Sequence, residues 1–214
     1  VSDTGLVGHW EMDEGHGGQV RDKSGNGNHG TIYGATWGSS APEWVDDTSG
    51  GALEFDGVKD FISINANNDL SLGVSYSFWA FIDNNQGHPW PRIFYQDGGS
   101  NDIEMAAGMM DSCRFRYAGN SIDSDTGYFI RNTRSHYLIT YDLNNVYFFR
   151  DGILFDVKSF QNNGTISLLN AIGRGNISLV GSISDVRIYN RALSEAEIQK
   201  IYEYGRTNKF YISE

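Results

Sequence analysis

The chain has little cysteine, proline or positive charge, and these shortages exclude several classes of protein. Cys113 is the only cysteine among 214 residues, so neither an intrachain disulfide nor a CxxC zinc or redox site can form. Sixteen Lys and Arg stand against 27 Asp and Glu, a net charge of −11, which argues against nucleic acid and anionic membranes as partners. The surplus of carboxylates suits hard cations such as Ca²⁺.

Long apolar runs are also missing. No segment approaches the roughly 18 apolar residues of a membrane-spanning helix, so membrane insertion is not expected. The chain starts at Val1 without a charged and apolar leader, and an extracellular or cell-surface protein whose leader has been removed is compatible with that start.

Glycine and aromatic residues are abundant. The 26 glycines against 3 prolines, with 12 Tyr, 12 Phe and 5 Trp, indicate many tight turns around a substantial core. Alternating runs rich in β-branched and aromatic residues predict strands at residues 61–64, 76–82, 137–141, 146–149 and 183–189. The Asp151-Gly152 pair between two apolar runs predicts a hairpin turn. We therefore expect an all-β fold.

Only the end of the chain shows helical periodicity. Ser194 and Glu197 have the spacing of a capping box, and Gly205 is a stop signal. The apolar residues that follow the box at i, i+3 and i+4 spacing are Ile198, Ile201 and Tyr202. They give a short C-terminal helix one face that can dock on the sandwich. With no internal repeat, residues 1–205 are predicted to form one domain and residues 206–214 a tail or linker.

Three segments together resemble the laminin-G-like, concanavalin A-like jelly rolls of bacterial, archaeal and viral proteins. They are residues 5–10 with 13–15 and 22–30, residues 51–57 leading into the strand at 61–64, and residues 172–174 with 181–194. The resemblance implies a sandwich of two stacked antiparallel sheets. The first and last segments of the chain would meet at one edge of it. The resemblance also implies carbohydrate recognition or adhesion by a non-catalytic module of a larger protein.

A candidate metal site begins at Asp22. Ser24, Asn26 and Asn28 place oxygen-bearing side chains at every second position after it, and Ca²⁺ takes about six to eight oxygen ligands. An EF-hand is rejected, because Tyr33 stands where its bidentate Glu would be needed. In the resembling family this loop lies near an Asp of the final strand. The resemblance therefore implies one structural Ca²⁺, held by some subset of Asp13, Asp22, Asn26, Asn28 and Asp185. The alternative is that Asn and Gly only supply turn conformations.

A candidate ligand surface lies around residues 86–92. Sugar sites combine an aromatic ring with planar polar groups, and Trp90 stands between two prolines that stiffen the loop. The predicted ligand-binding residues are Trp90, His88, Arg92, Tyr95, Asp97, Asn101, Arg116 and Tyr117. The alternative is that Trp90 closes one end of the core. We interpret Trp10, Trp44 and Trp79 as packing residues. The sequence does not decide the role of Trp37.

Catalysis has weaker support. The acids in residues 11–14 (EMDE) are similar to those of jelly-roll glycoside hydrolases, but Gly15 and His16 occupy the places where the second catalytic carboxylate belongs. Neither a zinc-hydrolase histidine pair nor a Gly-x-Ser-x-Gly elbow is present. The sequons at Asn163 and Asn176 matter only in an organism that glycosylates.

The functional prediction is a carbohydrate-binding or adhesion module of a secreted or surface protein, stabilised by Ca²⁺. Its partner would be a glycan or cell-surface polysaccharide. The alternative is a structural or assembly domain of a surface layer, fibre or filament that binds other protein domains. A glycoside hydrolase is the third reading.

Overall fold

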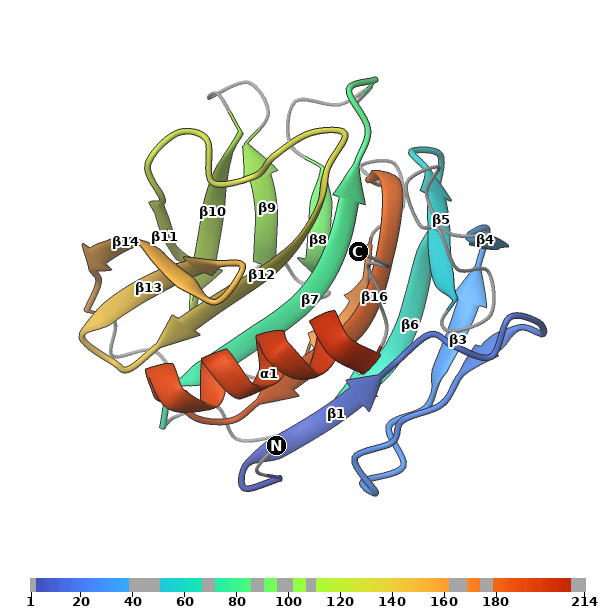
Figure 1. The fold of residues 1–214 in the computed structure, drawn as a ribbon, viewed down its shortest axis with the longest axis horizontal. Helices are drawn as coiled ribbons and strands as arrows, with labels where there is room; N and C mark the ends of the chain where they lie inside the picture. The colour runs from blue at the N-terminus through green and yellow to red at the C-terminus, as the bar shows by residue number, and fades with distance from the viewer. Residues whose placement is uncertain are drawn as a thin grey trace.

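The computed structural model describes residues 3–38, 51–66, 72–85, 91–95, 102–106, 111–161, 169–173 and 179–208. Within them the chain forms two eight-stranded antiparallel sheets and one helix, α1, at Glu195–Asn208 (Figure 1). The all-β prediction is confirmed. The described part contains no helix long and apolar enough to cross a membrane.

Sheet A has the order β14-β13-β12-β7-β16-β5-β4, and β1 also pairs with β16. Its strands are β1 (Leu6–Trp10), β4 (Thr36–Gly38), β5 (Ala52–Asp56), β7 (Val74–Ile82), β12 (Arg134–Tyr141), β13 (Asn145–Arg150), β14 (Ile153–Ser159) and β16 (Val180–Tyr189). Sheet B has the order β11-β10-β9-β8-β15-β6-β3-β2. Its strands are β2 (Gln19–Val20), β3 (Gly30–Tyr33), β6 (Phe61–Ala66), β8 (Arg92–Tyr95), β9 (Asp102–Ala106), β10 (Ser112–Tyr117), β11 (Asn120–Asp123) and β15 (Leu169–Ile172).

The strands predicted from alternation lie inside β6, β7, β12, β13 and β16. The predicted hairpin joins β13 and β14, where Asp151 and Gly152 have φ of 51° and 75°. Two consecutive positive φ values are the requirement of a type I′ turn, whose twist matches that of the flanking strands. The terminal segments also meet as predicted, because β1 pairs with the final strand β16.

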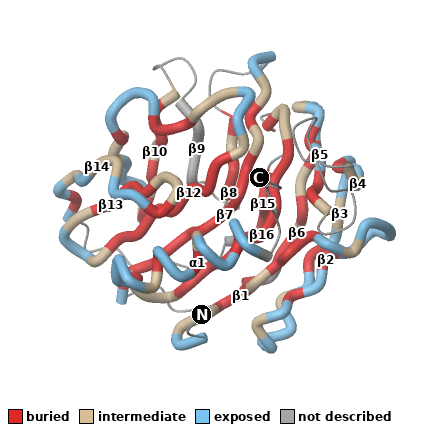
Figure 2. The backbone as a smooth tube through the Cα atoms, in the orientation of Figure 1, coloured by how far each residue is buried: buried red, intermediate tan, exposed pale blue. Residues whose placement is uncertain are grey.

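Aromatic side chains fill the space between the two sheets. Phe78 of sheet A meets Phe94 of sheet B edge-on, with ring centroids 5.3 Å apart. Tyr141 likewise contacts Phe115 of sheet B at 5.7 Å. Burial alternates along β10, where Cys113, Phe115 and Tyr117 are buried, whereas β7, β12 and β16 are buried along almost their whole length (Figure 2). Trp10 lies in this core, fully buried, as predicted.

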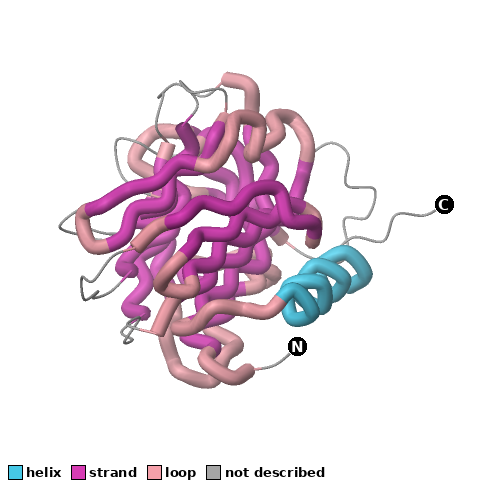
Figure 3. Tube along the Cα trace, turned by 90° about the vertical axis from the view of Figure 1, so that its left-hand side faces the viewer, coloured by secondary structure: helices cyan, strands magenta, loops and turns pink. Residues whose placement is uncertain are grey.

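Helix α1 lies across the outer face of sheet A, outside the sandwich (Figures 1 and 3). Its predicted apolar face is confirmed. Ile198 and Ile201 are fully buried, and the ring of Tyr202 stacks on Trp79 with centroids 5.8 Å apart. The sheet and connecting residues that receive the helix are Leu138, Phe149, Tyr189 and Leu193. Trp37, left open by the sequence, lies half-buried on β4 and donates its Nε1–H to the Gly17 carbonyl.

The capping box forms with a third partner. The backbone N–H of Ser194 donates to the Glu197 carboxylate at 3.0 Å, as predicted, whereas the Ser194 hydroxyl also donates to that carboxylate rather than capping an amide. Arg191 binds the same carboxylate through its guanidinium. The hydrogen bond from Arg191, more than the bonds from Ser194, lowers the pKa of Glu197 to about 2.

Gly205 does not end the helix, which was the prediction, because α1 continues to Asn208. The residue is buried against the indole of Trp79, and a Cβ there would lie 2.2 Å from Trp79 Nε1. Glycine at this position therefore lets the helix lie close to the sheet, and it does not terminate the helix. The predicted domain boundary at residue 205 accordingly falls inside the helix, and residues 209–214 lie outside the described part.

Replacing Gly205 tests this close approach. In an ordinary helix Gly→Ala stabilises by about 1 kcal/mol. Here we expect Gly205→Ala to destabilise by about 1–3 kcal/mol, because the Trp79 ring, held between Tyr202 and Arg134, cannot yield. Denaturant unfolding measures the change, with the exposed Lys200→Ala as a control expected to stay within about 0.5 kcal/mol. A gain in stability for Gly205→Ala would contradict the account.

The ion-paired carboxylate of Glu197 makes the free energy of unfolding depend on pH. Its pKa is about 2 in the folded protein and near 4.5 unfolded, so its stabilising contribution is complete above pH 4.5. That contribution is lost as pH falls from 4.5 towards 2. We expect the stability difference between wild type and Glu197→Gln to shrink across this window, and thermal unfolding at several pH values measures it. A difference that does not change with pH would show that the carboxylate charge is not responsible.

Candidate functional site

Asp22 organises the loop that was predicted to bind Ca²⁺. One carboxylate oxygen accepts from the N–H groups of His9 and Ser24, and the other accepts from the Ser24 hydroxyl and the Asn28 N–H. Burial alone would raise the pKa of Asp22, but these hydrogen bonds outweigh it and lower the pKa below its usual value. Both oxygens are therefore engaged within the chain.

The two asparagines of the loop face backbone carbonyls of β1. The Asn26 side-chain amide donates to the Leu6 and Val7 carbonyls at 2.8 and 3.1 Å. The Asn28 side-chain amide donates to the Val7 carbonyl at 2.8 Å. Gly25 and Gly27 have the left-handed φ values of 88° and 76° that the turn alternative expects, whereas Asn26 and Asn28 tie the loop to β1 through their side chains.

The remaining predicted ligands already contact cations of the chain. Lys23 binds Glu11 and, at 2.7 Å, Asp13. Burial would lower the pKa of Lys23, but its hydrogen bonds to Asp13 and Glu11 raise it to about 12. Asp185 is 1% exposed and contacts His9 Nε2 at 2.8 Å and the Arg187 guanidinium at 3.1 Å.

The predicted calcium ligands thus fall into three hydrogen-bonded groups, around Asp22, Lys23 and Arg187, and do not form one cage. The metal-capable side chains that come together within the described ranges are His9, Glu11 and Asp185, whose ligand atoms lie within 4.8 Å of one another. Tyr204 of α1 closes this group, since its hydroxyl donates to Glu11 and its ring covers Arg187. The predicted ligands, in these three separate groups, do not fit a single calcium site. Ca²⁺ binding stays a prediction.

The predicted ligand surface is only partly described. His88, Trp90, Asp97 and Asn101 lie outside the described residues. Arg92, Tyr95 and Arg116 do lie together, all half-buried, on the outer face of sheet B. Tyr117 was a wrong prediction. It follows Arg116 on the strand and therefore points inward, where it is 1% exposed and contacts Tyr141.

Strand register explains how the outer face of sheet B is assembled. Tyr95 pairs with Asp102, and Asp102 pairs with Arg116, so these positions form one row across β8, β9 and β10. The next row along pairs Arg92 with Glu104 and Glu104 with Arg114. Residues directly opposite in an antiparallel pair share a face.

Two contacts order this surface. The Arg92 guanidinium carbon lies 4.9 Å from the centre of the Tyr95 ring, a cation–π contact that fixes the ring. Arg114 donates two hydrogen bonds of 2.8 Å to the Asp123 carboxylate. Within the described residues no helix covers this face, so its half-buried side chains can meet a ligand.

The acids considered for hydrolysis have structural partners. Glu11 and Asp13 bind Lys23, and Glu14 accepts the Arg21 N–H at 2.7 Å. The Asp185 carboxylate lies within 4.8 Å of the Glu11 carboxylate, but Asp185 is 1% exposed and contacts His9 and Arg187. Their arrangement gives no support to a retaining or inverting pair.

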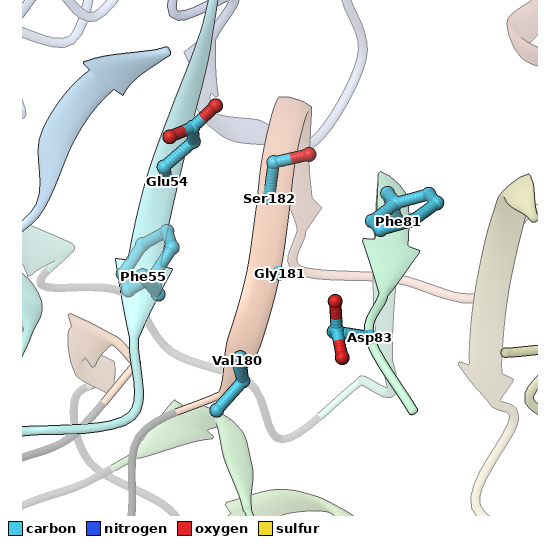
Figure 4. Close-up of a pocket in the computed structure, with 7 residues that line it drawn as sticks. All are labelled: Glu54, Phe55, Phe81, Asp83, Val180, Gly181 and Ser182. Carbon is cyan, nitrogen blue, oxygen red and sulfur yellow. The ribbon is translucent and has the colours of Figure 1, made fainter. Parts of the chain in front are cut away.

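Sequence reasoning missed a groove on the outer face of sheet A. It has a cavity volume of about 220 Å³ and lies where β5, β16 and β7 run side by side (Figure 4). Its lining consists of Glu54, Phe55, Phe81, Asp83, Val180, Gly181 and Ser182. The only sequence signal was the polar residues at outward positions of otherwise apolar strands.

Replacing Lys23 tests whether the carboxylates of Glu11 and Asp13 need a cation beside them. We expect Lys23→Met to destabilise by about 1–3 kcal/mol, between the values for exposed and buried ion pairs, because Glu11 and Asp13 lose their cation. Thermal unfolding in EDTA and in Ca²⁺ measures both effects. If the carboxylates can accept a metal, Ca²⁺ restores part of the loss in the variant. Heat on adding Ca²⁺ to the EDTA-stripped wild type would instead support the original calcium prediction.

Comparisons with solved structures agree on the fold. The binding domain of Paraclostridial Mosquitocidal Protein 1 superposes with a TM-score of 0.72 at 18% identity, over 95% of this chain and 53% of that one. The receptor-binding domain of botulinum neurotoxin C/D mosaic serotype superposes with a TM-score of 0.72 at 14% sequence identity. The superposition covers 94% of this chain and 52% of that one. This chain therefore spans about half the length of the two toxin domains.

Domain 4 of AbnA, a GH43 extracellular arabinanase from Geobacillus stearothermophilus, was solved in complex with arabinotriose. It superposes with a TM-score of 0.69 at 16% identity, over 94% of this chain and all of that one. No curated protein matches the chain. Residues 56–199 match the laminin G family described as the concanavalin A-like lectin/glucanases superfamily. With this match over most of its length and with the two-sheet fold, the chain belongs to the laminin-G-type branch of the concanavalin A-like superfamily.

Proposed function

We propose that the chain is a non-catalytic carbohydrate-binding module that recognises a glycan on the outer face of sheet B. The observation that carries the proposal is the row formed by Tyr95 and Arg116, with Arg92 beside it, on a face that no helix covers in the described part of the chain. Residues predicted separately from the sequence as sugar contacts are brought together there by strand register.

The chemistry of this face suits a neutral sugar. The Tyr95 ring offers an apolar plate for the face of a pyranose, and planar guanidinium groups donate paired hydrogen bonds to adjacent hydroxyls. The other predicted sugar contacts, His88, Trp90, Asp97 and Asn101, lie outside the described residues and stay predictions.

Two further facts support a binding role rather than catalysis. Two of the structural neighbours are named as binding domains, and a third is an enzyme domain in complex with arabinotriose. The acids of residues 11–14 are held by Lys23 and Arg21. An extracellular or cell-surface location is part of the proposal and accords with the fold family.

One feature favours the alternative of a protein partner. Strand β14 lies at the end of sheet A, and Ile153, Leu154 and Val157 on it are 71%, 44% and 44% exposed. An edge strand with exposed apolar side chains is a surface on which another chain can pair or pack. This surface belongs to sheet A and the sugar row to the outer face of sheet B, so the two functions are separable by mutation.

A glycan array with the purified domain, in Ca²⁺ and in EDTA, tests the proposal. We expect a specific glycan signal whose affinity falls about tenfold or more in Tyr95→Ala, Arg116→Ala and Trp90→Ala, because each removes a sugar contact. Tyr33→Ala, an exposed tyrosine at the other edge of sheet B, is the matched control and keeps full affinity.

Two results would contradict it. A blank array in both buffers would favour the protein-binding alternative. Loss of binding in Tyr33→Ala but not in Tyr95→Ala would move the sugar site to the stacked Tyr33–Phe61 pair at the edge formed by β3 and β6. Circular dichroism of each variant shows whether the fold is retained.

A further inference from the structure

Strand β14 is the longest of the strands that end the two sheet orders. It has seven residues, against three in β4, four in β11 and two in β2. It lies beside β13 at the left-hand end of the molecule in Figure 1. Three of its side chains, Ile153, Leu154 and Val157, are apolar and exposed. An edge of this length and composition is a surface on which a further strand can pair.

The hydrogen bonds around Val157 show which backbone groups of this edge point outward. The N–H of Phe160, directly after the strand, donates to the Asn144 carbonyl on the β13 side at 2.8 Å. Successive residues of an antiparallel strand direct their backbone groups to opposite sides, so those of Val157 and Ser159 face away from β13. In agreement, the Val157 N–H donates to the neighbouring Asp156 carboxylate at 2.7 Å.

A bulge in β14 brings two of the apolar side chains to one face. Leu154 pairs with Phe149 and Val157 pairs with Tyr147, with the irregularity between these two pairs. Phe149 and Tyr147 both belong to the group that packs around α1 on the outer face of sheet A. Because residues directly opposite in an antiparallel pair share a face, Leu154 and Val157 also lie on the outer face.

The edge is held in place from both ends of the strand. Gln199 of α1 donates to the Gly152 carbonyl in the hairpin turn. Lys158 contacts the carboxylates of Asp125 and Asp156 at 2.6 and 3.1 Å, which ties the strand to the segment before β12. A strand that is already fixed loses little conformational entropy when another strand pairs with it.

The charges of β14 select a second copy of the same strand. When two β14 strands pair antiparallel about a two-fold axis at Val157, Asp156 of each copy lies opposite Lys158 of the other. An axis one residue earlier or later would place Asp156 opposite Asp156, or Lys158 opposite Lys158. Like charges directly opposite destabilise an antiparallel pair, so the axis at Val157 is favoured.

We propose that β14 pairs with β14 of a second copy of this chain, antiparallel and centred on Val157, so that the two A sheets join into one. The two Val157 residues exchange their outward N–H and C=O groups, and each Asp156 keeps its own Lys158 and gains that of the other copy. Such a dimer presents two B sheets. Bivalent sugar binding by it rests on the proposed function, whereas the dimer itself does not.

Sedimentation velocity of the intact chain from about 1 to about 300 µM tests the proposal, in about 0.15 M salt to screen the charge of −11 on each copy. We expect a reversible dimer. Val157→Pro should raise its Kd about tenfold or more, because proline removes an outward N–H that the monomer does not need for its own sheet. Hydrogen exchange should slow at the Val157 and Ser159 amides in the dimer and stay unchanged at Lys158.

Two charged variants locate the axis. Val157→Lys and Val157→Glu each place like charges opposite one another, and each should raise the Kd about tenfold or more. An equimolar mixture of the two should form a heterodimer, because opposite charges then meet. Val58→Lys alters a valine of the turn between β5 and β6 that is 67% exposed, against 44% for Val157, and should leave the dimer intact. Tyr95→Ala should also leave it intact, so the glycan array and this experiment fail independently.

A single monomer mass over the whole concentration range would overturn the proposal. So would a dimer that persists in Val157→Pro, or a mixture of the lysine and glutamate variants that stays monomeric. Melting temperatures show whether each variant is folded. If Val157→Pro does not fold, the two charged variants and their mixture decide the result.

Discussion

Backbone pairing along β16 holds this molecule together, because a single strand serves three neighbours. It pairs with β7 along one side, and with β5 and then β1 along the other. The change from β5 to β1 occurs at a bulge, where Asp185 takes a φ of 45° and its N–H meets the Glu11 carbonyl at 3.3 Å. The first and last strands of the chain are joined at that point.

The bulge turns a carboxylate into the buried layer beneath α1, and that layer must then be neutralised. Arg187 and His9 contact Asp185, while Tyr204 of the helix covers Arg187. Asp185, one of the predicted calcium ligands, therefore contacts residues that pack against the helix. Breaking one buried pair leaves the other charge without compensation, which is why such layers tolerate little change.

The same polar layer continues towards the middle of sheet A. His136 is fully buried, bonds the Ser77 hydroxyl at 2.8 Å and packs on Trp79. Burial lowers the pKa of His136 to about 3, so the ring is neutral at physiological pH. Helix α1 thus covers the part of the outer face of sheet A around Trp79, Leu138 and Tyr189, and the groove over Gly181 lies outside that part. Sheet B has no such cover among the described residues, and Arg92, Tyr95 and Arg116 on its outer face are half-buried.

The sequence by itself determined the fold class, the main strands, the Asp151-Gly152 hairpin, the docking face of α1 and the family resemblance. These features depend on period, turn chemistry and capping, which act between residues close together in the chain. The grouping of Arg92, Tyr95 and Arg116 was expected from their nearness in the sequence, whereas strand register decides which of them lie in one row. The inward direction of Tyr117 was readable from the same alternation, since adjacent residues on a strand face opposite sides.

Only the tertiary structure decided what the loop at Asp22 and the residue Gly205 do. The Asn26 and Asn28 side chains, and one oxygen of Asp22, bond groups of β1 that lie up to 21 positions away in the chain. No local pattern specifies whether an oxygen meets a metal or an amide. Gly205 is set by Trp79, which belongs to a distant strand. The groove of Glu54, Phe81 and Ser182 exists because three strands from different parts of the chain lie in register, and long-range register is the property that a one-dimensional pattern leaves undetermined.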